Sequence, residues 1–305
     1  MFTRALLVCS LLAVVSALAQ TPLPGDRPGQ TPAGQQAGTV SPAGPASAPA
    51  PAAMPSIALM RLEKSPRHQE WIDVKSGSRA VHTFVVYPEV KDKAMTVIVI
   101  HENRGLNDWA RAVADRLAEN GYIALAPDLL TGTAPGGGNT PDFPTQSAAT
   151  EAIGKLPAAQ VLADLNALAD YAKSIPSANG RLAVTGFCWG GGKAWAFAVA
   201  RHDLALANVF YGTPPADDAA CAGIACPVLG YYGGNDSRVN STIEKSTAGM
   251  KAAGKTYEPV IYDGAGHAFM RLGEEADSSP DSAANKKAMT EGWERLLAAL
   301  AKVKG

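Results

Sequence analysis

The amino-acid sequence predicts an α/β domain in which a mostly parallel sheet carries helices on both faces. Residues 56–305 alternate between short apolar segments of strand length and longer segments with helical periodicity. The segment at residues 95–100 is apolar except for Thr96, which is typical of a strand buried on both faces of a parallel sheet. Repeated strand–helix units favour parallel pairing, and about 250 residues are a suitable length for one domain.

The strands are predicted from apolar and β-branched residues bounded by turn residues. They are expected at residues 80–87, 95–100, 122–126, 181–185, 206–211, 227–232 and 256–262. Residues 131–144 are rich in Gly and Pro, so a loop is expected there.

Each predicted helix has a capping residue, an apolar face or small residues that allow close packing. Asn107 or Asp108 can cap a helix that runs to about residue 120 and closes at Gly121. Pro157 suits the first turn of a strongly amphipathic helix. The other helices are expected at residues 190–200, which are mostly small, at 239–253, and at 284–302, where Met289, Trp293, Leu296 and Leu300 align.

The first 55 residues indicate a targeting segment and a linker. Arg4, the apolar run after it and a small-residue cleavage signal predict a secretory signal peptide, residues 1–19, cut after Ala19. The mature protein is then expected to be secreted, in the periplasm; an uncleaved membrane anchor is the alternative. Residues 20–55 hold nine of the 22 prolines and no aromatic residue, so they predict a disordered linker.

Composition excludes several classes of partner. The 27 basic and 28 acidic residues nearly cancel, so no nucleic acid or anionic membrane partner is expected. No apolar run reaches the roughly 20 residues that span a bilayer. The four cysteines include no CxxC pair, which argues against a structural metal site and a thiol–disulfide oxidoreductase. We expect a monomer that acts on a small molecule and uses no cofactor.

The sharpest motif is the sequence GFCWGG at residues 186–191, between a predicted strand and a predicted helix. A nucleophile with glycines two residues away on either side, at a strand-to-helix turn, is typical of a nucleophile elbow. The glycines allow the sharp turn, and the helix start directs N–H groups at a developing anion. Cys188 would be the nucleophile; the alternative is a buried structural cysteine.

Two further groups follow later strands. Asp236 comes after the strand at 227–232 and His267 after the strand at 256–262. Each has a simple alternative, an Asx turn for the acid and a solvated loop side chain for the histidine. The order Cys188, Asp236, His267 matches the nucleophile–acid–histidine order of α/β-hydrolases, so we predict that fold. Asp263 is a rival acid, but its position four residues before His267 indicates a turn.

Four segments carry a resemblance to a known family. They are residues 101–105 (HENRG), 126–129 (APDL), 186–191 (GFCWGG) and 266–269 (GHAF), and their order and spacing run through most of residues 75–300. In these segments the chain resembles the dienelactone hydrolase family. The resemblance implies a single-domain α/β-hydrolase with a Cys-Asp-His triad of Cys188, Asp236 and His267.

The same resemblance implies roles for neighbouring residues. Glu102 matches a glutamate that contacts the resting thiol, and the backbone N–H groups of Asn103 and Trp189 match an oxyanion hole. A carboxylate beside a thiol disfavours the thiolate unless it takes the proton itself. We therefore hypothesise that Glu102 keeps Cys188 protonated until substrate arrives; the alternative pairs Glu102 with Arg104.

The substrate site departs from the family pattern. Two arginines hold the substrate carboxylate in that family, and Arg271 matches one of them. Residues 128–132 contain no arginine where the other is expected, which leaves Arg104 as a substitute and argues against an anionic lactone. Trp189 and Phe269, beside the nucleophile and the base, predict an apolar or aromatic acyl site unless they only pack.

The remaining cysteines predict a local disulfide. Cys221 and Cys226 lie five positions apart before a strand, and in a secreted protein they can close a short loop.

We predict a secreted hydrolase of a carboxylic ester or lactone that forms an acyl-enzyme on Cys188. An acyltransferase or thioesterase would use the same triad. A catalytically silent scaffold that only binds a ligand is the alternative of another class, because a fold alone does not prove activity.

Overall fold

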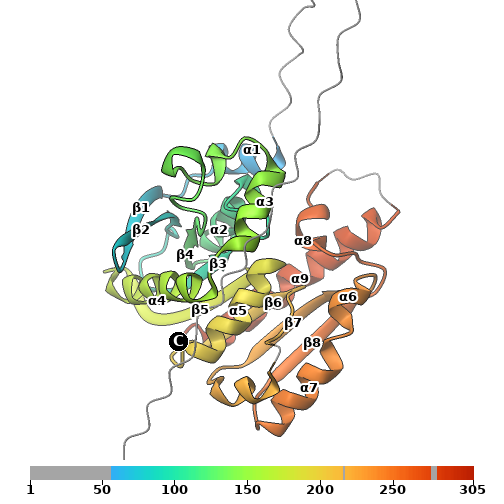
Figure 1. Cartoon of the computed structure of the whole chain (residues 1–305). Coiled ribbons are helices and arrows are strands. Elements are labelled where there is room, and N and C mark those ends of the chain that lie inside the picture. Colours follow the sequence, from blue (N-terminus) through green and yellow to red (C-terminus); the bar gives the residue numbers. More distant parts are fainter. Residues whose placement is uncertain (1–55, 216, 276–279) are drawn as a thin grey trace, which may run out of the picture. The chain divides into compact units, whose positions relative to one another are not determined.

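A single eight-stranded sheet organises the part of the chain that the structure describes. The computed structural model describes residues 56–215, 217–275 and 280–305 (Figure 1), so the expected signal peptide and linker lie outside the described residues. The strands, in the spatial order β1-β2-β4-β3-β5-β6-β7-β8, are β1 (Gln69–Ser76), β2 (Arg79–Val86), β4 (Ile123–Pro127), β3 (Ala94–Ile100), β5 (Ala178–Phe187), β6 (Leu206–Phe210), β7 (Val228–Gly233) and β8 (Tyr257–Tyr262).

The strand directions bring several strand ends to one edge. β1, β2 and β4 pair antiparallel, whereas all pairs from β4 through β3 and β5 to β8 are parallel. Ile100 of β3 is in register with Gly186 of β5, and Phe187 is in register with Phe210 of β6. The residues that follow these three strands therefore emerge side by side, where ligands bind in parallel α/β sheets.

Helices cover both faces of the sheet. On one face, α1, α2 and α9 pack through residues such as Leu62, Trp109 and Leu296, and on the other, α4, α5 and α7 pack through residues such as Leu165 and Trp195. The helices are α1 (Ile57–Lys64), α2 (Asp108–Glu119), α3 (Gln146–Lys155), α4 (Ala158–Ser174), α5 (Trp189–Ala200), α6 (Ser237–Asn240), α7 (Ile243–Ala252), α8 (Phe269–Leu272) and α9 (Ser282–Val303). This arrangement confirms the predicted fold.

Several elements were not expected from the sequence, among them β1, α1 and α3. β1 reads QEWIDVKS, and its charged residues obscure the strand pattern. Charged residues are tolerated there because β1 is an edge strand with a largely uncovered face. α1 has only eight residues, and its apolar run at residues 57–60 is too short to predict a helix. Beyond the expected loop, which holds the short 3-10 turns η1 (Pro135–Gly137) and η2 (Thr140–Asp142), α3 begins where the Thr145 hydroxyl accepts a hydrogen bond from the N–H of Ala148 at 3.1 Å.

The predicted disulfide is not formed. Cys221, in the 3-10 helix η3 (Asp218–Gly223), and Cys226, just before β7, are both buried in the core with Ile224, and Cys226 keeps its thiol. A buried thiol behaves as a small apolar group, so packing explains this cysteine. Burial also raises the pKa of Cys226 to about 11.

Candidate active site

Cys188 occupies a strained turn between β5 and α5. Its φ of 55° and ψ of −117° lie in a region that residues with a side chain rarely adopt. The backbone N–H of Cys188 donates to the carbonyl oxygen of Phe210 at 3.0 Å, which ties the turn to the end of β6. The side chain is only partly buried, so the thiol is accessible above the sheet edge.

The glycines on either side are required by close backbone contacts. A Cβ atom on Gly186 would lie 2.1 Å from the carbonyl oxygen of Gly190. A Cβ atom on Gly190 would lie 2.4 Å from the carbonyl oxygens of Ile100 and His101. Any larger residue would push α5 away from β3 and β5, so the spacing of the motif has a steric cause.

The structure brings Cys188, His267 and Asp236 together. Nε2 of His267 lies 3.1 Å from Sγ of Cys188, and Nδ1 of His267 lies 2.5 Å from Oδ2 of Asp236. Asp236 is 7% exposed and also accepts a hydrogen bond from the N–H of Val239 at the start of α6. Asp263 is exposed and makes no such contact, which agrees with its interpretation as a turn residue.

The environment of His267 favours the imidazolium. Burial lowers its pKa, but the hydrogen bonds and charges of Cys188 and Asp236 together outweigh that effect and raise the pKa to about 9. At neutral pH the ring therefore carries a proton on both nitrogens. A ring that carries a proton on Nε2 can donate a hydrogen bond to the sulfur of Cys188, which lies 3.1 Å away.

Glu102 does not make the predicted contact with the thiol. Its buried carboxylate accepts hydrogen bonds from Nε of Arg271 at 2.9 Å and from the hydroxyl of Tyr211 at 3.2 Å. A guanidinium binds a carboxylate more strongly than a neutral thiol does, which explains the difference. The alternative partner Arg104 is not involved either, because its Nε donates to Oε1 of Gln146 at 3.3 Å.

Tyr211 is a site residue that sequence reasoning missed. It is almost fully buried, with a φ of 40°, and its ring meets that of His267 edge-on with the centroids 5.0 Å apart. Burial, followed by the nearby Glu102 carboxylate, raises the pKa of its hydroxyl well above the usual value, so the hydroxyl remains a hydrogen-bond donor. Tyr211 directly follows β6, and that placement at the shared sheet edge was the available signal.

A pocket of about 320 Å³ opens at the thiol. Cys188, Asn103, Trp189, Tyr211 and Thr150 are among its lining residues. Trp189 begins α5, so its N–H has no acceptor within the helix. The hydroxyl of Thr150 donates to the carbonyl oxygen of Asn103 at 2.9 Å and holds that segment against α3.

The remaining predicted substrate residues lie in different places. Phe269 is fully buried and packs on Tyr211 and Tyr262, which favours the packing interpretation over substrate contact. Arg271 is held by Glu102 and by Glu275 at 3.1 Å, so its charge is balanced in this structure. Within the described ranges, no group of three or more His, Cys, Asp and Glu side chains could hold a metal ion, and no helix is long and apolar enough to cross a membrane.

The sheet topology and the strand-to-helix turn define an α/β-hydrolase. Comparison with known proteins identifies the family: residues 81–304 match the dienelactone hydrolase family. The chain belongs to this family and is a hydrolase of carboxylic esters or lactones.

Individual relatives agree with this assignment. A protein of Methylorubrum extorquens named "Putative carboxymethylenebutenolidase" is 36% identical over 212 residues, which are 66% of this chain and 69% of the relative. A protein of the same name from Escherichia coli K12 is 34% identical over 214 residues, 66% of this chain and 74% of the relative. The crystal structure of a "Putative Dienelactone Hydrolase" from Klebsiella pneumoniae is similar with a TM-score of 0.67 and 28% identity, covering 77% of this chain and 98% of that one.

Proposed function

We propose that this protein hydrolyses a carboxylic ester or lactone through an acyl-enzyme on Cys188. The observation that carries the proposal is the continuous contact from Sγ of Cys188 through His267 to Asp236, with distances of 3.1 and 2.5 Å. The strained turn, which exposes the thiol beside a helix start, supports the same role.

In the first half of the reaction the thiolate of Cys188 attacks the carbonyl carbon of the substrate. The carbon–sulfur bond forms, the carbonyl electron pair moves to oxygen, and the backbone N–H groups of Trp189 and Asn103 bind the resulting oxyanion. The oxyanion then collapses, the bond to the leaving oxygen breaks, and the His267 imidazolium gives its proton to that oxygen. The alcohol part of the substrate leaves, or stays attached when the substrate is a lactone.

In the second half, water releases the acyl group. Neutral His267 takes a proton from water while the hydroxyl attacks the thioester carbon. Collapse of this oxyanion breaks the carbon–sulfur bond, and the free acid leaves the Cys188 thiolate beside the His267 imidazolium. Asp236 holds Nδ1 of the ring throughout, so Nε2 faces the reacting atoms.

Glu102 has a positioning role in this proposal. Its carboxylate joins Arg271 on one oxygen to Tyr211 on the other, and the Tyr211 ring packs on His267. We propose that this chain of contacts keeps the imidazole in place. The pairing of Glu102 with Arg271 also leaves little net positive charge for a substrate carboxylate there, which is consistent with a substrate other than a small anionic lactone.

The test compares the wild-type chain with Cys188→Ala, and with Cys226→Ala as the matched control. Hydrolysis of p-nitrophenyl acetate and of an aryl lactone is followed by absorbance. We expect kcat to fall by about 10³-fold or more in Cys188→Ala, because the residual rate then depends on binding and the oxyanion hole alone. Cys226→Ala should keep the wild-type kcat. Equal rates in wild type and Cys188→Ala would contradict the proposal.

We also propose that the protein acts outside the cytoplasm, after removal of residues 1–19. Intact mass spectrometry of the protein recovered from a periplasmic extract is expected to give a chain that begins at Gln20. A chain that retains residues 1–19 would contradict this part of the proposal.

A further inference from the structure

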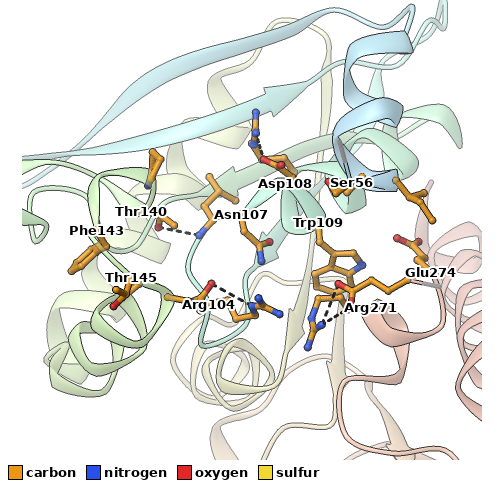
Figure 2. A pocket seen from close by; sticks show the side chains of 18 of the residues that line it. Ser56, Arg104, Asn107, Asp108, Trp109, Thr140, Phe143, Thr145, Arg271 and Glu274 are labelled. Atoms are coloured by element: carbon orange, nitrogen blue, oxygen red, sulfur yellow. Dashed lines mark hydrogen bonds and ion pairs between the residues drawn. The ribbon is translucent and has the colours of Figure 1, made fainter. Parts of the chain in front are cut away.

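The loop that follows β3, residues 101–106, borders two pockets. Asn103 lines the pocket of about 320 Å³ at the thiol, whereas Arg104 lines a second pocket of about 860 Å³. Figure 2 shows this second pocket, whose wall also includes Trp71 of β1 and residues of α1. Packing holds a segment only where other atoms meet it, so the conformation of this loop depends on specific hydrogen bonds.

Each end of this loop is held by a side-chain hydrogen bond. At the outer end, the N–H of Leu106 donates to the hydroxyl of Thr140 at 3.1 Å, which Figure 2 shows as a dashed line. The same hydroxyl donates to Oδ1 of the buried Asp128 at 2.7 Å. At the inner end, Nδ1 of the fully buried His101 lies 2.7 Å from the carbonyl oxygen of Glu102.

The partners of the two ring nitrogens fix the protonation of His101. The carbonyl oxygen of Glu102 can only accept, so Nδ1 carries a proton and donates it. The backbone N–H of Leu129 can only donate, so Nε2, 3.3 Å away, accepts. Burial also lowers the pKa of His101, although the nearby charge of Asp128 acts in the opposite direction. The ring is therefore neutral, and its single N–H is committed to Glu102.

The carbonyl that His101 binds belongs to the same peptide group as the N–H of Asn103. In a trans peptide the carbonyl oxygen and the N–H point in opposite directions, and no peptide bond in the described chain is cis. The hydrogen bond to the Glu102 carbonyl therefore turns the N–H of Asn103 away from the buried ring. This N–H donates to no acceptor among the described residues, and Asn103 lines the thiol pocket.

His101 also contacts the residue that bears the second N–H of the proposed oxyanion hole. Its ring stacks on the ring of Trp189, with the centroids 5.6 Å apart and the planes 10° from parallel. Its backbone carbonyl lies against the start of α5, where a Cβ atom on Gly190 would be 2.4 Å from the oxygen. One buried side chain therefore touches both parts of the chain that supply these N–H groups.

We infer that His101 is a positioning residue for the proposed oxyanion hole. Its Nδ1–H orients the peptide group that carries the N–H of Asn103, and its ring supports Trp189, which carries the other N–H. The inference rests on the proposed function, in which both N–H groups bind the oxyanion. Removal of one such donor typically lowers kcat by about 10²–10³-fold, so a misdirected donor should have a measurable effect.

Two substitutions separate the donor of His101 from its acceptor. His101→Asn keeps an amide N–H at the place of Nδ1 and loses the acceptor for Leu129, whereas His101→Gln keeps an acceptor near Nε2 and loses the donor. Acylation by p-nitrophenyl acetate is followed by stopped-flow absorbance. We expect it to be slowed about 10-fold or more in His101→Gln and to be several times faster in His101→Asn than in His101→Gln. The control His82→Gln should acylate at the wild-type rate.

Two further measurements separate this role from a purely structural one. Iodoacetamide reacts with a thiolate at a saturated carbon: the carbon–sulfur bond forms as iodide leaves, and no oxyanion develops. Its rate of alkylation of Cys188 should therefore be the same in wild type and both His101 variants. Urea unfolding should find His101→Asn no more stable than His101→Gln, because it leaves the N–H of Leu129 unpaired. Stability and acylation are thus expected to rank the two variants differently.

Three results would overturn the inference. They are a wild-type acylation rate in His101→Gln, an equal loss of acylation in His101→Gln and His101→Asn, and a loss of alkylation that parallels the loss of acylation. Any of these in a chain whose wild type is acylated on Cys188 contradicts this inference alone. A wild type that is not acylated on Cys188 contradicts the proposed function, and this inference with it.

Discussion

Cys188 and Cys226 show how two regions of the same sheet place one residue type in contrasting environments. Cys188 follows β5 in a strained, partly exposed turn, with its sulfur 3.1 Å from the imidazole of His267. Cys226 precedes β7, is 6% exposed, and has a pKa raised by burial to about 11. The comparison teaches that the partner and the solvent, more than the cysteine itself, decide whether a thiol can become a nucleophile.

The largest effect is expected when the partner of Cys188 is removed. His267→Gln should lower kcat/KM for p-nitrophenyl acetate by about 10²–10⁴-fold, since both the stabilising charge and the proton donor are lost. The matched control is His82→Gln, because Nδ1 of His82 also contacts a carboxylate, Asp73, at 2.9 Å but has no cysteine as a neighbour. A loss of similar size in His82→Gln would show that the fold, not the thiol partner, was damaged.

A glycine near Cys188 and a glycine near Cys226 should also differ in how much stability is lost when each is replaced by alanine. Gly190→Ala places a Cβ 2.4 Å from the β3 backbone, so we expect a loss of about 3 kcal/mol or more in the free energy of unfolding. Gly223→Ala, near Cys221, places a Cβ 2.9 Å from the carbonyl oxygen of Val199 and should cost less. Urea unfolding checks both, and an equal cost at the two positions would argue against a specially tight turn at Cys188.

The Cys188–His267 pair should make stability depend on pH. The pKa of His267 is raised to about 9 in the folded protein, above its value of about 6.5 in an unfolded chain. The stabilisation is therefore fully present below about pH 6.5 and is lost as the pH rises through about 9. The unfolding free energy of wild type should exceed that of His267→Gln by more at pH 6 than at pH 10. The same difference at both pH values would mean that Cys188 and Asp236 do not raise the pKa of His267.

The smallest effect is expected at Cys226. Cys226→Ala should lower the unfolding free energy by only about 1 kcal/mol, since one buried sulfur is removed from the core. Cys226→Ser should cost more, because a buried hydroxyl without a partner is added. Thermal unfolding under reducing and non-reducing conditions checks both variants. A large stability loss on adding reductant to the wild type would instead indicate the disulfide that the structure lacks.

Local patterns explain why the fold and the positions of the proposed catalytic groups could be predicted from the sequence. The glycines at 186 and 190 are fixed by contacts within a few residues and with the neighbouring strand, and these contacts follow from the turn itself. The central strands β3 and β4 are apolar except for Thr96, because both faces of the sheet are covered there. Each proposed catalytic group follows directly after a strand or in the loop beyond it, so the parallel topology alone brings them to one edge.

The remaining features depend on contacts that no local pattern contains. Glu102 and Arg271 are 169 positions apart. Only the folded geometry shows that the Glu102 carboxylate binds the guanidinium of Arg271 instead of the thiol of Cys188. The edge strand β1 mixes polar and apolar residues because little covers its outer face. In the sequence Trp71 is an isolated aromatic residue, and only the fold brings α1 to the same pocket. The prediction of a disulfide between Cys221 and Cys226 was wrong, because a spacing of five positions permits a disulfide but does not require one.

The most direct test of the account is to observe the acyl-enzyme. The wild-type chain is mixed with p-nitrophenyl acetate, quenched with acid within the first turnovers, and digested for peptide mass spectrometry. The account predicts the mass increase of one acetyl group on the peptide that contains Cys188, none on the peptide that contains Cys226, and no adduct in Cys188→Ala. Hydrolysis that continues with Cys188 unmodified, or an acetyl group on another residue that is required for turnover, would contradict it.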